Sequence, residues 1–141
     1  MKRRAFVLLN RAMNVVLRRL GVRRFRGADL LYLTTTGRKS GQKRTTPLLY
    51  LAEPDRWVVV ASNAGADWEP GWWLNLRAGT PATVAVGGRV TPVTGTEITE
   101  PEREGVWRTL NDRVFDYESY QAKVRRKLAV VALKPADAPP A

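Results

Sequence analysis

The chain of 141 residues contains neither cysteine nor histidine. Without cysteine it has no disulfide framework, no thiolate nucleophile and no cysteine-ligated metal, and its composition is compatible with a reducing cytoplasm. Without histidine, Ser-His-Asp and Cys-His catalysis are excluded, and so is the commonest protein ligand of zinc, iron and copper. If the chain is an enzyme, we therefore expect its reactive chemistry to reside in a bound organic cofactor.

Acidic side chains are scarce, 13 against 24 Lys and Arg, and the imbalance lies at one end of the chain. Residues 1–28 contain nine Lys or Arg and no acid, whereas the remainder is nearly balanced. A protein that binds nucleic acid is expected to spread positive charge over a binding face, so we expect no nucleic-acid partner. The carboxylate pairs Glu53/Asp55 and Asp67/Glu69 lie in expected turns, and we interpret them as solvated rather than as a magnesium site.

Residues 3–20 are predicted to form a basic amphipathic helix, because apolar residues recur on one face at the 3.6-residue period. The uncharged run Ala5–Leu9 is too short for a signal-peptide core or a bilayer span. Either the apolar face packs on the rest of the protein, or the helix lies on an anionic membrane surface. We expect a cytoplasmic protein, located at the inner membrane face in the second case. The predicted division is a basic segment at 1–28, a domain at 29–135 and a frayed tail at 136–141.

From residue 30 the apolar period changes to two and β-forming residues dominate, which predicts strands. The expected strands are Leu30–Thr36, Lys43–Ala52, Trp57–Ser62, Ala82–Gly87, Arg89–Ile98 and Lys127–Leu133. A short helix is expected over Pro70–Ala78, and a Thr99–Glu102 capping box predicts a longer helix that reaches about Phe115. Residues 116–124 are expected to form a second helix or a bend. Mostly antiparallel strands with inserted helices indicate an α+β protein built on a small β-barrel or roll.

The most specific segment is a basic turn between the first two strands, Gly37-Arg38-Lys39-Ser40-Gly41-Gln42, followed closely by Arg44. Glycines let backbone N–H groups turn toward one point, and the cations supply charge for an anionic ligand. The turn is not a Walker P-loop, because Lys-Ser precedes the second glycine and no helix follows. Taken alone, a basic hairpin turn is most often simply a solvated turn.

Two later segments favour a ligand site. Ala61–Ala66 is a small-residue loop after the third strand, where a planar ring can approach the backbone and its amide N–H groups. Trp68, Trp72 and Trp73 follow; one of the last two is expected to pack in the core while the other is free to stack on a ring. Tyr117 and Tyr120, three residues apart, are expected on one face of a helical turn. Their phenols suit the orientation of a carbonyl or nitro oxygen, or proton donation.

The motif Leu33–Gln42, with Arg44, Thr46 and Pro47 after it, followed by Ala61-Ser62-x-x-Gly65-Ala66 and Trp72-Trp73-Leu74-Asn75-Leu76, resembles the deazaflavin-dependent nitroreductase and quinone reductase family. The resemblance extends from about residue 30 to Pro135. It implies a split β-barrel related to the FMN-binding oxidases. It also implies that coenzyme F420, an 8-hydroxy-5-deazaflavin, is the hydride donor. Family members reduce quinones, and some reduce nitroaromatic compounds or activated alkenes.

The resemblance also implies roles for individual residues. Arg38, Lys39 and Arg44 would meet the phosphodiester and glutamates of the coenzyme tail, Ser62 and its neighbours would form a backbone wall against the ring, and Tyr117 and Tyr120 would lie on the substrate side. The full set of residues expected to bind the cofactor is Arg38, Lys39, Ser40, Gly41, Arg44, Thr46, Pro47, Val60, Ser62, Asn63, Gly65, Gly71 and Trp72. Asn63 and Gly71 depart from the Lys and larger residue that relatives often have, which bears on affinity and substrate choice.

Other functions are compatible with the same sequence. The same fold could bind FMN, or haem by a ligand other than histidine. A non-catalytic module that contacts membrane or nucleic acid through residues 1–28 is a third possibility. The oligomeric state does not follow from the sequence.

Overall fold

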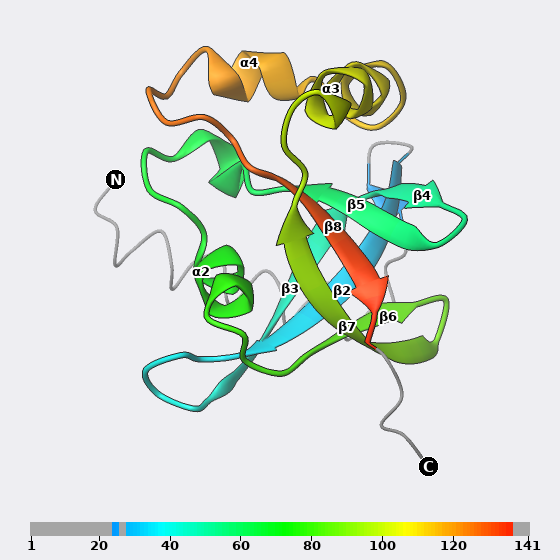
Figure 1. Cartoon of the computed structure of the whole chain (residues 1–141), viewed down its shortest axis with the longest axis vertical. Coiled ribbons are helices and arrows are strands. Elements are labelled where there is room, and N and C mark those ends of the chain that lie inside the picture. The colour runs from blue at the N-terminus through cyan, green and yellow to red at the C-terminus, as the bar shows by residue number, and fades with distance from the viewer. Residues whose placement is uncertain (1–23, 26–27, 137–141) are drawn as a thin grey trace.

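The computed structural model describes residues 24–25 and 28–136. Figure 1 shows a strongly curled sheet with helices on one side and one end. The elements in chain order are β1 (Arg24–Phe25), β2 (Ala28–Thr36), β3 (Lys43–Leu49), β4 (Leu51–Glu53), β5 (Arg56–Val60), the single 3-10 turn η1 (Asn63–Gly65), α2 (Gly71–Arg77), β6 (Ala82–Val86), β7 (Arg89–Glu97), α3 (Glu102–Arg113), α4 (Tyr117–Gln121) and β8 (Val130–Pro135).

Every strand pairing among the described residues is antiparallel, in agreement with the predicted mostly antiparallel strands. The sheet runs β2-β6-β7-β8-β5-β4, and β3 pairs with the other edge of β2. β3 is thus the first strand of this pairing path and β4 is the last. Because only Tyr50 separates β3 from β4, the two ends of the path belong to one bent segment. The predicted continuous strand Lys43–Ala52 is therefore wrong in one respect: it bends at Tyr50, so that its halves pair with β2 and β5. The strand count exceeds the expected six through this bend and the two-residue β1.

The core has two parts that share β5 and β8. Val59 and Val131 belong to a cluster with the tryptophans of α2, whereas Val58 and Val130 belong to a cluster with residues of α3 and α4. Since successive strand residues point to opposite faces, both faces of these two strands are buried. The near-continuous apolar runs Trp57–Ala61 and Leu128–Leu133 follow from this double burial.

The close contact of α2 with the sheet depends on a glycine in β7. A Cβ built on Gly95 would lie 2.8 Å from Cδ1 and 3.2 Å from Cβ of Leu76, which is buried on α2. No other residue type fits that approach without displacement of the helix or repacking of Leu76. Gly95 therefore sets how near α2 lies to β7.

The predicted boundaries of α3 and of β8 are wrong at both ends. The helix α3 begins after Pro101, which makes no side-chain capping bond. The Glu100 carboxylate accepts from the Glu104 N–H at 2.8 Å, whereas Thr99 contributes only its carbonyl oxygen, which accepts from the Arg103 N–H at 3.0 Å. Proline disfavours a helical conformation at the residue before it, so the helix begins later than the capping box predicts. It also ends at Arg113 rather than near Phe115.

The last strand lies three residues later than predicted at its start and two residues later at its end. Both backbone groups of Leu128 are bonded to side chains: its N–H donates to Gln121 at 2.9 Å, and its carbonyl accepts from Arg103 at 2.8 Å. The ladder with β5 consequently begins at Val130. Pro135, beyond the end of the predicted strand, is the partner of Val93 in β7. The predicted helix at 3–20 and the tail residues 137–141 lie outside the described residues.

Candidate active site

The basic turn between β2 and β3 is closed by its own backbone. The Gly37 N–H donates to the Gln42 carbonyl at 2.8 Å, and the Gly41 N–H donates to the Gly37 carbonyl at 2.9 Å. Gly41 has φ +71°, which glycine adopts without strain, and a Cβ on Gly37 would lie 2.5 Å from Oγ of Ser40, so a larger residue at 37 would displace the Ser40 hydroxyl. The Ser40 hydroxyl accepts from the Gln42 N–H at 3.1 Å. The turn thus presents Arg38 and Lys39 as exposed side chains.

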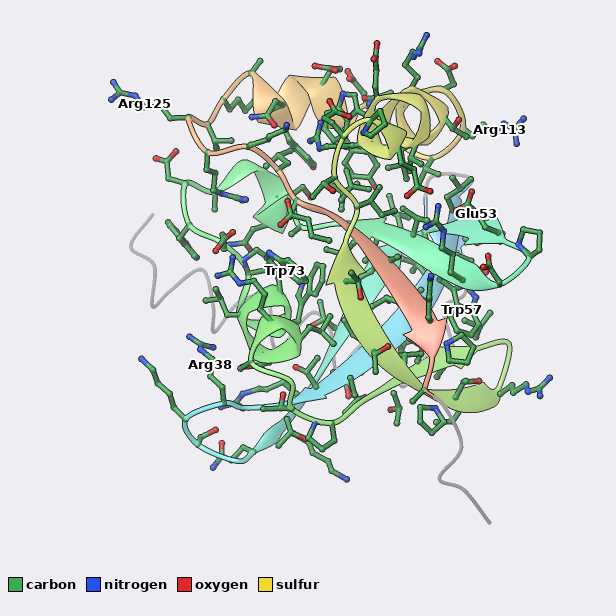
Figure 2. The ribbon with its side chains drawn as sticks, viewed as in Figure 1. Arg38, Glu53, Trp57, Trp73, Arg113 and Arg125 are labelled. Atoms are coloured by element: carbon green, nitrogen blue, oxygen red, sulfur yellow. The ribbon has the colours of Figure 1, made fainter. Side chains whose placement is uncertain are left out.

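A buried asparagine of α2 holds this turn in place. Oδ1 of Asn75 accepts from both the backbone N–H of Arg38, at 3.1 Å, and its guanidinium, at 3.0 Å. The Asn75 amide nitrogen donates to the Thr35 hydroxyl at 3.1 Å. Asn75 is 5% exposed and Thr35 is 1% exposed, so the bond between them is shielded from water, and the two bonds to Arg38 are partly shielded. Figure 2 shows Arg38 beside α2.

The other predicted residues of this hairpin lie on β3. Arg44 is half-buried and donates to the Gln42 side chain at 3.1 Å. Thr46 and Pro47 pair with Leu33 and Tyr32 of β2 and are half-buried. The hairpin therefore brings together the three predicted cations, of which Arg38 has a buried anchor, Arg44 has a side-chain partner within the hairpin, and Lys39 is exposed.

The loop after β5 has an unusual backbone. Asn63, Ala64 and Gly65 are consecutive residues with positive φ, of +48°, +52° and +81°. This conformation costs roughly 1–2 kcal/mol for an ordinary L-residue, and asparagine and glycine tolerate it best. The Gly65 N–H donates to the Ser62 carbonyl, and the Asn63 amide donates to the Trp68 carbonyl at 3.0 Å. Asn63 thus shapes the loop through its side chain, a role that the sequence did not indicate. Val60, also predicted to bind the cofactor, ends β5 and is buried in the cluster under α3 and α4.

Arg126, which the sequence did not single out, stabilises this loop by hydrogen bonds to its backbone carbonyls. Its guanidinium donates to the carbonyls of Ala61 at 3.0 Å, Ser62 at 3.1 Å and Ala66 at 3.0 Å. Burial lowers the pKa of Arg126 from its usual value, and the charges of Glu69 and Asp67 act in the opposite direction. The contacts span about sixty residues of sequence, so no local pattern could have revealed them.

The two adjacent tryptophans of α2 are both in the core: Trp72 is 7% exposed and Trp73 is 2% exposed. The guanidinium carbon of Arg77 lies 5.5 Å from the Trp73 ring centroid. The Trp73 indole nitrogen is buried and has no hydrogen-bond partner among the described residues. Gly71 begins α2 with open space around its Cβ position.

The two tyrosines of α4 have different surroundings. Tyr117 is 4% exposed and packs against Trp107 and Phe115, with ring centroids 6.3 and 5.5 Å away. Burial raises the pKa of Tyr117 above its usual value, with a further contribution from Tyr120. Tyr120 is half-buried and lies against the loop after β5, since a Cβ on Gly65 would be 3.2 Å from its ring. The structure therefore brings Tyr120, but not Tyr117, to the Ser62–Gly65 loop.

Comparison with known proteins assigns the family. A family model described as F420H(2)-dependent quinone reductase matches residues 4–135. An F420H(2)-dependent quinone reductase of Mycobacterium tuberculosis is 35% identical over 106 residues, which cover 73% of this chain and 71% of that protein. A solved structure described as an F420-H2 dependent reductase (FDR-A) superposes with a TM-score of 0.66 at 34% identity and covers 74% of this chain and 93% of that one.

These similarities define a coenzyme-dependent oxidoreductase. The chain belongs to the F420H2-dependent quinone reductase family. It is an enzyme that transfers a hydride from reduced coenzyme F420, as the sequence motifs predicted, and F420 rather than FMN is its coenzyme. A haem storage protein of Vibrio cholerae, HutZ, has a TM-score of 0.56 at 10% identity, over 77% of this chain and 82% of that one, which shows a shared fold only.

None of the helices in the described part of the chain is long and apolar enough to cross a membrane. No group of three or more carboxylates among the described residues is arranged to hold a metal ion.

Replacement of Asn75 by alanine should free the basic turn. The change removes three hydrogen bonds and leaves the Thr35 hydroxyl unpaired, so we expect a loss of about 1–3 kcal/mol in the free energy of unfolding. Urea denaturation measures this loss, and hydrogen exchange should be faster at the Arg38 amide. The control is Asn111→Ala on α3, which removes another carboxamide with two bonds but should leave exchange at Arg38 unchanged. Equal Arg38 exchange in Asn75→Ala and the native protein would contradict the anchoring role.

Proposed function

We propose that the coenzyme tail binds on the β2–β3 turn and that the deazaflavin ring lies against the Ser62–Gly65 loop. The observation that carries this proposal is the anchoring of Arg38. Its backbone and guanidinium both donate to the buried Asn75, so its position is fixed before any ligand arrives. A fixed cation beside the exposed Lys39 favours binding of an anionic group, because less side-chain freedom is lost on binding.

The available donors match the chemistry of F420. The phosphodiester and glutamates of its tail need cations, which Arg38, Lys39 and Arg44 supply from a single hairpin. Its ring carries carbonyl oxygens, which need N–H donors such as the backbone of the Ser62–Gly65 loop.

We assign the residues the following tasks. When bound, the reduced coenzyme supplies the hydride. The Ser62–Gly65 loop and the start of α2, with Gly71 and Trp72, cover the ring and exclude water. Ser40, Gly41, Thr46 and Pro47 shape the tail site next to the cations. Tyr120, half-buried beside Gly65, orients an oxygen of the acceptor or donates a proton to it, and Tyr117 supports it as a neutral, buried phenol.

Quinones are the acceptors that the family name indicates, and we propose that nitroaromatic compounds and activated alkenes are further acceptors. In each of these, a hydride adds to an electron-poor unsaturated system and a proton follows. Hydride transfer depends on position and on exclusion of water, which explains how a chain without histidine and cysteine can catalyse it. We also infer that the curled sheet is a split β-barrel, since its pairing path returns to the same bent segment at Tyr50.

Removal of single cations tests the tail site. Lys39→Ala and Arg44→Ala should each raise the dissociation constant of oxidised F420 about tenfold, the loss expected for one charge-assisted hydrogen bond. Isothermal titration measures it, and the effect should shrink at high salt. Arg113→Ala on α3 is the charge-matched control, since Arg113 lies on the opposite side of the molecule from the turn (Figure 2). Unchanged affinity in both test variants would place the tail elsewhere.

Removal of the Tyr120 hydroxyl tests its proposed role. Tyr120→Phe keeps the packing against Phe115 and Gly65 but removes the donor, so kcat with a menaquinone analogue should fall on the order of 10²-fold. Tyr117→Phe, which changes a buried phenol away from the loop, should reduce kcat much less. Stopped-flow loss of the absorbance of the reduced coenzyme gives both rates. If the two variants matched the native rate, neither tyrosine would take part in the chemistry.

We further propose that the basic segment at 1–28 contacts an anionic membrane surface, supported by its nine cations and its lack of acids. Most of this segment lies outside the described residues. The full chain should sediment with vesicles that contain phosphatidylglycerol, and salt should release it. Vesicles of neutral phosphatidylcholine are the control, and equal retention on both would refute an electrostatic contact.

A further inference from the structure

The guanidinium of Arg126 fixes the direction of three peptide groups in the loop after β5. Nη1 donates to the Ala61 carbonyl at 3.0 Å, and Nη2 donates to the carbonyls of Ser62 at 3.1 Å and Ala66 at 3.0 Å. Nε makes a longer bond to Ala66 at 3.3 Å. The single guanidinium of Arg126 therefore binds three carbonyl oxygens of the loop, and all three point toward it.

The consequence lies on the opposite side of the same peptides. In a planar trans peptide, the C=O and the N–H of the next residue point in opposite directions. Because the carbonyls of Ala61 and Ser62 point at Arg126, the N–H groups of Ser62 and Asn63 point away from it. No acceptor for either N–H is present among the described residues. Two adjacent donors are thus directed together away from the guanidinium.

The neighbouring contacts keep this arrangement rigid. The next two N–H groups with partners, those of Gly65 and Ala66, turn back onto the carbonyls of Ser62 and Asn63 at 2.9 and 3.0 Å. The Tyr120 ring lies against Gly65 and closes the loop from the α4 side. Without Arg126, three carbonyls would lose their hydrogen-bond donor. Fewer contacts would then stabilise the left-handed backbone conformation of Asn63 and Ala64.

We propose that Arg126 is a positioning residue for the coenzyme: by drawing the carbonyls of Ala61, Ser62 and Ala66 to one side, it presents the N–H groups of Ser62 and Asn63 to the carbonyl oxygens of the deazaflavin ring. This inference rests on the proposed placement of the ring at this loop. The positive charge behind the two peptides also polarises them toward the ring, which strengthens both donors. Arg126 does not touch the ring itself.

The test separates binding of the ring from binding of the tail. Arg126→Gln removes the charge and most of the donors, and Arg126→Lys keeps the charge but cannot reach three carbonyls. Titrations use oxidised F420 and the deazaflavin riboside that lacks the phosphodiester and glutamates. We expect Arg126→Gln to raise both dissociation constants by about the same factor, roughly tenfold, and Arg126→Lys to recover part of the loss. Lys39→Ala should weaken F420 and leave the riboside unchanged.

A buried arginine elsewhere controls for loss of folding stability. Arg103 donates to the Leu128 carbonyl at 2.8 Å and lies over Trp107, with no bond to the loop. Arg103→Gln should lower the melting temperature without a change in affinity for the riboside. Hydrogen exchange in the free protein should be faster at residues 62–66 in Arg126→Gln only. If Arg126→Gln fails to fold, the same titrations and hydrogen-exchange measurements are made on Arg126→Lys.

Native affinity for the riboside in the folded Arg126 variants would overturn the proposal. The same loss in Arg103→Gln would overturn it as well, because the effect would then be one of stability. A change for F420 that is absent for the riboside would place Arg126 at the tail. Failure of the tail site alone has a different signature: Lys39→Ala and Arg44→Ala leave F420 binding unchanged, while the Arg126 variants still weaken the riboside.

Discussion

The arrangement of this protein depends on a covalent constraint, the single residue that separates β3 from β4. Tyr50 joins a strand that pairs with β2 to a strand that pairs with β5, so the ends of the sheet cannot move apart. The curl that follows buries both faces of β5 and β8. Among the connections outside the sheet are the β2–β3 turn and the segment from β5 to α2. The proposed site is assembled from these two irregular connections on a rigid support.

Both connections are stabilised by a polar side chain from a distant part of the chain, the buried Asn75 in one case and the half-buried Arg126 in the other. Asn75 accepts the donors of the β2–β3 turn, and Arg126 donates to the carbonyls of the loop after β5. Irregular backbone cannot satisfy its own polar groups as a helix or strand does, so it needs such partners. Arg103 has the same relation to Leu128. Polar groups in this protein thus determine the shape of the loops, while apolar burial determines the shape of the sheet.

Much of this could be predicted from the sequence, and the failures have physical causes. The period-two pattern located the main strands, and the motif around Gly37 and Gly41 identified the family, because both signals are local. The bend at Tyr50 was missed since a continuous β-forming run does not reveal a change of partner strand. The capping box at Thr99 failed because Pro101 delays the helix. Arg126 was missed because its partners lie about sixty residues away, and Asn75 was noted only as part of a motif.

The two hydrogen bonds from Arg38 to one oxygen of Asn75 have a consequence for how such a site can change during evolution. One of the two donors is main chain, so a lysine or glutamine at position 38 would keep that bond and lose only the other. An apolar residue at position 75 would remove both hydrogen bonds to Arg38 and also the hydrogen bond to the Thr35 hydroxyl. A substitution at position 38 therefore loses one hydrogen bond of the turn, whereas an apolar substitution at position 75 loses all three. A lineage that adapts to a different anionic tail would vary position 38 long before position 75.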